Sequence, residues 1–147
     1  MFQQIDKDIL EKLENRKQQG GSTALCALIR DQKVFIANAG DSKAIVVKKD
    51  GAIDLTKEHR ASNQEEQLRV ENMGGFVIVH KSRYLVQGSL QITRSIGDQK
   101  YKQFISCEPD IVEYSFSKDD LVLVMGSDGF WDVTSILLKN LIYYIKY

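Results

Sequence analysis

The chain is most constrained by a set of short apolar runs that are separated by residues typical of turns. These runs cover residues 23–29, 34–39, 44–47 and 121–125. Their apolar positions are nearly continuous instead of alternating, which is typical of β-strands covered on both faces. The sequence therefore predicts sheets whose strands are buried on both sides.

Two helices are predicted in the first half of the chain. Apolar residues recur at helical spacing over residues 2–13, and the glycines at 20–21 end that helix. Ser62, followed by Glu65 three positions later, is a capping box that begins the second helix, and the glycines at 74–75 end it.

Further strands and a last helix complete the predicted fold. Asp50 and Gly51 predict a hairpin with a type I′ turn, and Thr134 or Ser135 caps a final helix. Strand-like segments lie at residues 76–79, 84–86 and 111–116. Buried strands with helices predict an α+β fold, a layered β-sandwich with helices outside. The 147 residues suffice for one domain, spanning 1–147.

Composition narrows the possible partners. The 20 basic and 20 acidic residues give a formal net charge of +0, so no field favours nucleic acid or an anionic membrane. No apolar stretch approaches the roughly 18 to 20 residues of a transmembrane helix, and no signal peptide is recognisable. Cys26 and Cys107 lack metal-ligand spacing, and Cys26 is expected in the core. We expect a cytoplasmic protein.

Asp128 is the sharpest candidate for chemistry. It lies in the segment Met-Gly-Ser-Asp-Gly-Phe-Trp-Asp at residues 125–132, directly after a predicted buried strand. An unpaired buried carboxylate is costly, so this position requires a compensating partner. A metal cation would supply it, and so would an Asx-type hydrogen bond that caps the next turn. Trp131 is interpreted as an anchor in the core.

Asp41 has a similar position, because it also follows a predicted buried strand and a glycine. Taken alone, it is interpreted as part of a turn. Two such carboxylates would share a divalent ion if they met at one edge of a sandwich. His59 and His80 have no second ligand at suitable spacing, and residues 93–98 are interpreted as a turn in preference to a phosphate-facing loop.

Six motifs follow one another in the order found in a known family. They lie at residues 21–24 (GSTA), 36–44 (IANAGDSKA), 55–59 with 65–75 (LTKEH and EEQLRVENMGG), 90–98 (LQITRSIGD), 108–111 (EPDI) and 127–133 (SDGFWDV). Together they resemble the metal-dependent protein serine/threonine phosphatases of the 2C type, the PPM family.

The resemblance implies a β-sandwich of two antiparallel sheets flanked by helices. It also implies two Mg²⁺ or Mn²⁺ ions that activate a water for attack on phosphoserine or phosphothreonine. Asp128 matches an aspartate that bridges both ions. Asp132 and Asp41 match the pair that holds an additional ion in many members.

The chain departs from the family at both ends, where it resembles a truncated domain. Neither the early DGHGG motif and phosphate-binding arginine nor the late DN motif is found, so several metal ligands are missing. We therefore expect weak or absent Mg²⁺ or Mn²⁺ binding and little catalysis by the chain alone. Strand edges without partners also predict self-association, with a homodimer preferred.

Three functions follow from these expectations. The first is a pseudophosphatase-like module that binds a protein partner or a phosphoprotein. The alternative is an active serine/threonine phosphatase, as a fragment or completed by a partner chain. The third is a sensor of divalent ions that uses Asp41, Asp128 and Asp132.

Overall fold

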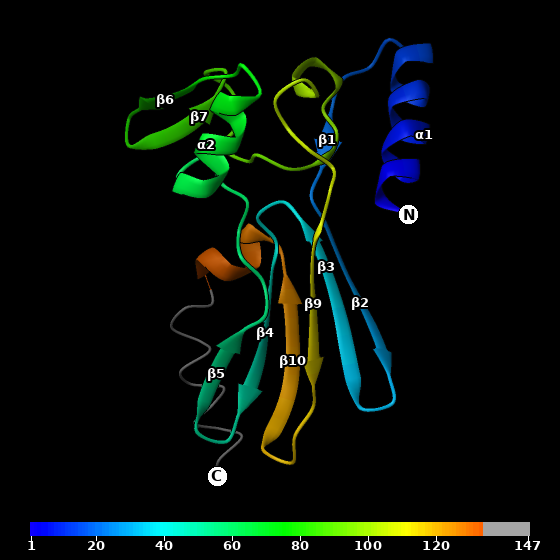
Figure 1. Cartoon of the computed structure of the whole chain (residues 1–147), viewed down its shortest axis with the longest axis vertical. Helices are drawn as coiled ribbons and strands as arrows, with labels where there is room; N and C mark the ends of the chain where they lie inside the picture. Colours follow the sequence, from blue (N-terminus) through cyan, green and yellow to red (C-terminus); the bar gives the residue numbers. More distant parts are fainter. Residues whose placement is uncertain (134–147) are drawn as a thin grey trace. The chain divides into compact units, whose positions relative to one another are not determined.

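The computed structural model describes residues 1–133, which form two compact units (Figure 1). Unit 1 comprises Met1–Ala24, Ala39–Asp41 and Glu58–Pro109, and unit 2 comprises Leu25–Asn38, Ser42–Lys57 and the described residues from Asp110 onward. Helices and antiparallel strand pairs confirm the α+β class. The single domain stays a prediction, and the predicted helix capped by Thr134 or Ser135 lies outside the described residues.

Unit 2 contains the predicted β-sandwich. One sheet has the order β2-β3-β9, formed by Ala24–Arg30, Lys33–Ala39 and Asp110–Ser115. The other has the order β10-β4-β5, formed by Asp120–Gly126, Lys43–Lys48 and Gly51–Asp54. The core between them consists of buried residues from β3, β4 and the segment after β5, namely Val34, Ile36, Ala44, Val46 and Leu55. Leu25, Tyr114, Leu123 and Met125 from the remaining strands pack against this cluster.

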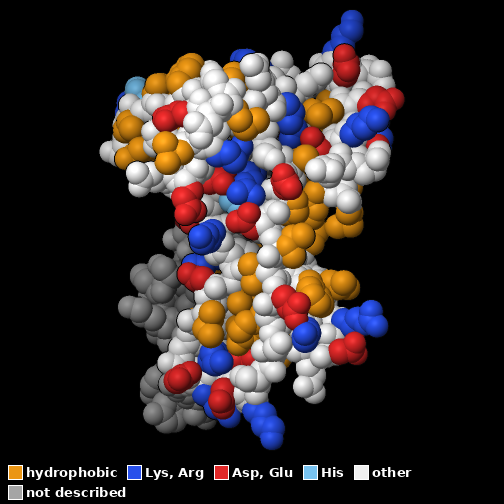
Figure 2. All heavy atoms as spheres, in the orientation of Figure 1, with side chains coloured by type: hydrophobic (Ala, Val, Ile, Leu, Met, Phe, Trp, Pro, Cys, Tyr) orange, Lys and Arg blue, Asp and Glu red, His pale blue; other side chains and the backbone are white. Residues whose placement is uncertain are grey.

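Burial separates the central strand β4 from the outer strand β2. The apolar positions 44–47 of β4 are all buried, as the continuous pattern predicts. The prediction is wrong for β2, where residues 26–30 are exposed and Leu28 retains 64% of its surface. It is also wrong for the start of β10, where Leu121 and Val122 are exposed. Cys26 is likewise exposed instead of buried. Both β2 and β10 are edge strands of their sheets in the described residues, and neither buried cluster includes residues 26–30. Hydrophobic side chains of this unit are visible at its surface in Figure 2.

The turns between strands differ in part from the prediction. The hairpin between β4 and β5 is present, but Lys48 pairs with Gly51, so its tip is formed by Lys49 and Asp50. Neither tip residue has a positive φ, so the predicted type I′ turn is wrong. Two-residue tips with positive φ at both positions occur instead at residues 31–32 and 81–82.

Unit 1 contains the helices α1 and α2, short strands and a 3₁₀ turn. In chain order its elements are α1 Phe2–Asn15, β1 Gly21–Ser22, α2 Gln64–Asn72, β6 Val77–His80, β7 Arg83–Val86, β8 Ile96–Gly97 and η1 Gln99–Tyr101. The strands pair antiparallel as β1 with β8 and β6 with β7. The core of this unit consists of Ala61, Val70, Val86 and Ile105.

Both helices of unit 1 are tied to the rest of it by polar contacts. Asp6 of α1 is buried, accepts a hydrogen bond from the Gly97 N–H at 2.8 Å and pairs with Lys102 Nζ at 2.8 Å.

Helix α2 begins one residue later than predicted, because the Asn63 side chain, not that of Ser62, accepts a hydrogen bond from the Glu65 N–H. Asparagine caps helices as well as serine does, so the choice between neighbours was not readable from sequence.

A buried ionic network around Glu66 joins α2 to the segment 93–95. The Glu66 carboxylate is 5% exposed and accepts hydrogen bonds from Arg94 Nη2 at 2.6 Å, Thr93 Oγ1 at 2.6 Å and Arg69 Nη2 at 3.0 Å. Arg94 also donates to the Glu108 carbonyl at 3.0 Å. Burial alone would raise the pKa of Glu66, but these hydrogen bonds outweigh it and lower the pKa to about 2.

We predict that Glu66→Gln lowers the free energy of unfolding by about 3 kcal/mol at neutral pH, because the lowered pKa stabilises the folded state by roughly that amount. The stabilisation is present above the ordinary glutamate pKa and is lost as the pH falls from about 4.5 towards about 2. Urea unfolding at several pH values measures it. Glu65→Gln, at an exposed neighbouring position, is the control. A stability difference that stays constant down to pH 2 would contradict this account.

Candidate functional site

Asp128 lies on the turn that follows β10. Residues 128–133 are helical, and the Asp128 carboxylate accepts a hydrogen bond from the Gly129 N–H at 2.8 Å. The side chains of Asp128 and Asp132 are both exposed, so the predicted burial of Asp128 is wrong. The strand before it does not enclose the turn, and the cost of an unpaired buried charge does not arise. The carboxylate thus has a local main-chain partner, but the bond comes from the next residue and not from the residue two positions on that an Asx turn requires.

Trp131 fixes this turn to the sheet of unit 2. Its indole N–H lies 2.9 Å from the Gly126 carbonyl at the end of β10 and 3.1 Å from the Lys43 carbonyl at the start of β4. The ring also packs edge-on against Phe130, with centroids 4.9 Å apart. Trp131 thus anchors the turn and positions Asp128 relative to two strands, but it is half-buried and not part of the core as predicted.

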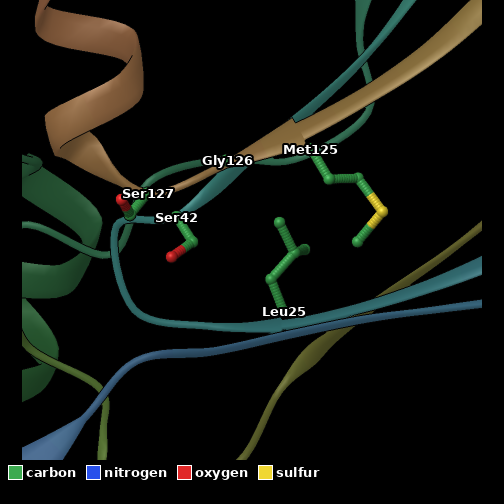
Figure 3. Close-up of a pocket in the computed structure, with 5 residues that line it drawn as sticks. All are labelled: Leu25, Ser42, Met125, Gly126 and Ser127. Atoms are coloured by element: carbon green, nitrogen blue, oxygen red, sulfur yellow. The ribbon is translucent and has the colours of Figure 1, made fainter.

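A hollow of about 270 Å³ lies beside this turn (Figure 3). It is lined by Leu25, Ser42, Met125, Gly126 and Ser127. The side chains of Leu25 and Met125 point into it, while the two serines add hydroxyl groups at one end. Neither of the exposed aspartates of the turn belongs to this lining. The described lining therefore offers apolar contact and hydrogen bonds but no group for acid–base chemistry.

Asp41 lies in unit 1, on the turn after β3, and is almost completely buried. Its carboxylate forms an ion pair with Arg60, the distance from Oδ2 to Nη2 being 3.1 Å. The preceding Gly40 is held by His59, whose Nδ1 accepts a hydrogen bond from the Gly40 N–H. His59 is thus a buried residue with a hydrogen-bond partner, and Asp41 has a basic partner that sequence reasoning did not identify.

The predicted metal ligands are distributed over both units. Asp41 belongs to unit 1, whereas Asp128 and Asp132 lie four positions apart in the helical residues of unit 2. Within residues 1–133, no group of three or more His, Cys, Asp and Glu side chains is placed to hold a metal ion. The part of the chain that the structure describes therefore does not fit a complete metal centre, and the ligand roles of these three residues stay predictions.

The segment 93–98 has a structural role. Thr93 and Ser95 are fully buried, and Arg94 is engaged by Glu66 and by the Glu108 carbonyl. Residues 96–97 form strand β8 instead of the predicted turn, and the buried, engaged side chains before them do not favour a phosphate-facing loop. Sequence reasoning missed Glu66 because the adjacent Glu65 fits the capping pattern. It missed Arg60 because the two residues of the ion pair are 19 positions apart.

Comparison with known proteins identifies related sequences. The family model "Protein phosphatase 2C" matches residues 1–136. "Probable protein phosphatase 2C 32" of Oryza sativa is 37% identical over 122 residues, which are 83% of this chain and 31% of that protein. "Probable protein phosphatase 2C member 13, mitochondrial", also from rice, is 37% identical over 132 residues, 90% of this chain and 36% of that protein. The chain thus spans about a third of the length of these curated relatives.

Solved structures show the same fold. A sex determining protein of C. elegans has a TM-score of 0.85 and 30% identity, and the match covers 90% of this chain and 33% of that one. A serine-threonine phosphatase 2C of Toxoplasma gondii has a TM-score of 0.81 over 93% of this chain and 51% of that one, at 24% identity. In the described part of the chain, no helix is long and apolar enough to cross a membrane.

Proposed function

Because the chain belongs to the protein phosphatase 2C family, we propose that it acts as a pseudophosphatase-like module that binds a protein and has weak or no phosphatase activity of its own. One observation carries this proposal. Two of the three carboxylates matched to metal ligands already have protein partners, since Asp41 pairs with Arg60 and Asp128 accepts the Gly129 N–H. A carboxylate that is already engaged is less available to hold a metal ion, which favours a binding role over hydrolysis.

Weak or absent metal binding is part of the same proposal. The family is metal-dependent, with Mg²⁺ or Mn²⁺ supplying an activated water when bound. Mg²⁺ takes oxygen ligands at roughly 2.0–2.1 Å in near-ideal octahedral geometry. Asp128 and Asp132 are exposed carboxylates on one helical turn, and an ion held by this pair alone would keep most of its water ligands. Such binding is expected to be weak.

An active serine/threonine phosphatase is the second candidate. The observation that favours it is the turn at 127–132, where Trp131 is tied to both β10 and β4 and the two aspartates remain accessible. Residues of a longer protein or of a partner chain would then complete the centre. The third candidate, a divalent-ion sensor, requires that Mn²⁺ binding produce heat in calorimetry.

The partner that we propose first is a second copy of this chain. Strand β2 carries exposed apolar residues along its length, among them Leu28 and Ile29. It also has a single neighbouring strand in the described residues, which leaves one edge for antiparallel pairing. A phosphoprotein is the other partner considered. The cytoplasmic location stays a prediction, and one rice relative is named mitochondrial.

The activity proposal is tested by phosphate release from a phosphothreonine peptide in millimolar Mn²⁺. We expect the same background rate for the native chain and for Asp128→Ala, because the described residues assemble no complete metal centre. Asp50→Ala, at an exposed hairpin tip, is the matched control for removing a surface carboxylate. Release that is lost in Asp128→Ala but kept in Asp50→Ala would sink the proposal and favour an active phosphatase.

The dimer proposal is tested by size-exclusion chromatography with light scattering. We expect a mass of twice the 16.7 kDa of one chain, and a shift to a single chain in Leu28→Lys, which places a charge on β2. Leu68→Lys, at an exposed apolar position of α2, controls for added charge outside the sheet. A native chain that is monomeric at all concentrations would contradict this part.

A further inference from the structure

Arg60 is shared by two carboxylates in unit 1. Its Nη2 lies 3.1 Å from Asp41 Oδ2, and its Nε lies 3.5 Å from Glu58 Oε1. The side chains of Asp41 and Arg60 are only 11% and 29% exposed. A positive charge placed between two carboxylates has the same electrostatic role as a cation bound there, and the guanidinium carries that charge at every physiological pH.

The main chain fixes the positions of both partners. The Gly40 N–H donates to His59 Nδ1 at 3.1 Å, and the His59 N–H donates back to the Gly40 carbonyl at 3.0 Å. His59 is 2% exposed, and its own carbonyl accepts a hydrogen bond from the Thr93 N–H at 2.9 Å. Asp41 and Arg60 directly follow these two clamped residues in sequence. Their ion pair is therefore built into the fold and does not depend on two mobile surface side chains meeting.

Gly40 makes this clamp possible. Its φ is +122°, which side chains rarely tolerate, and an added Cβ would lie 2.3 Å from the Thr23 side chain. Glycine therefore permits both the left-handed backbone of this turn and its close packing against Thr23. In this conformation the Gly40 N–H and carbonyl form the paired hydrogen bonds with His59.

We propose that Arg60 is a built-in cation at Asp41, so that Asp41 is an ion-pair residue in this chain and not a metal ligand. A divalent ion at Asp41 would have to displace the guanidinium and leave it unpaired in a largely buried place, which is costly. Removing Arg60 takes away the cation that lies between Asp41 and Glu58 and leaves two carboxylates at this place, a ligand type that divalent ions favour. The inference rests on contacts within unit 1 and holds whether or not the protein is an active phosphatase.

Calorimetric titration with Mn²⁺ tests the inference on the full chain. We expect the Asp41→Asn variant to give the same Mn²⁺ isotherm as the native chain. The Arg60→Gln variant should gain a site that binds Mn²⁺ about tenfold more tightly than any site of the native chain. The double variant, Arg60→Gln with Asp41→Asn, should lack this new site. Arg60→Lys, which keeps the positive charge, should gain no site.

Thermal unfolding gives a second readout. Arg60→Gln should lower Tm by about 5 °C without metal, because it removes the largely buried ion pair of Arg60 with Asp41. Millimolar Mn²⁺ should restore most of this loss in Arg60→Gln and none of it in the double variant. If Arg60→Gln does not fold, the inference is tested by comparing the Mn²⁺ titrations of Asp41→Asn and of the native chain.

Two results would overturn the inference. One is Mn²⁺ binding by the native chain that disappears in Asp41→Asn, which would make Asp41 a metal ligand despite Arg60. The other is a folded Arg60→Gln variant without an Asp41-dependent site. Failure of the proposed function looks different, because phosphate release by the native chain would show a Mn²⁺ site away from Asp41, and the isotherm of Asp41→Asn would still match that of the native chain.

Discussion

The packing of β3 against β4 is the interaction on which unit 2 depends. Each is the central strand of its sheet, and their buried side chains, Val34 and Ile36 with Ala44 and Val46, form the middle of the core. Full burial of a valine or isoleucine side chain stabilises a fold by roughly 1.5–3 kcal/mol. The register of β4 then sets the end of β10, since Lys43 pairs with Gly126. The turn with Asp128 begins where this pairing stops, and Trp131 bonds to the carbonyls of that last pair.

The two candidate carboxylates show how one sequence pattern leads to two physical outcomes. Both Asp41 and Asp128 follow a strand, and both need a partner for their charge. Asp41 is largely buried and receives a guanidinium, whereas Asp128 is exposed and receives a main-chain amide. The buried position requires a full countercharge because desolvation is costly there. The exposed position does not, since water solvates the remaining oxygen. Membership of the protein phosphatase 2C family therefore shows the fold, while the activity depends on what surrounds each carboxylate.

Local patterns predicted the elements well and their surroundings poorly. The strands β3, β4 and β10 follow from apolar runs, β9 follows from the strand-like segment at 111–116, and α1 follows from helical spacing. The same kind of apolar run gave a wrong prediction of burial at β2, because the composition of a strand does not show whether a neighbouring layer covers it. The helix cap at Asn63 and the hairpin tip at Lys49 and Asp50 each lie one residue from the predicted position. Adjacent polar residues can take either role, so the sequence does not distinguish them. The pairing of Arg60 with Asp41 was beyond prediction, because it arises from the close approach of two turns distant in sequence.

The central proposal is that Asp41, paired with Arg60, is not a metal ligand in this chain, and that Asp128 and Asp132 bind Mn²⁺ weakly at most. The most direct measurement is Mn²⁺-induced line broadening in the amide spectrum of the ¹⁵N-labelled protein. At most weak, non-saturating broadening is expected, confined to residues near Asp128 and Asp132, with the amides of Gly40 and Arg60 unaffected at stoichiometric Mn²⁺. Broadening that saturates at one equivalent and includes residues around both Asp41 and Asp128 would contradict it.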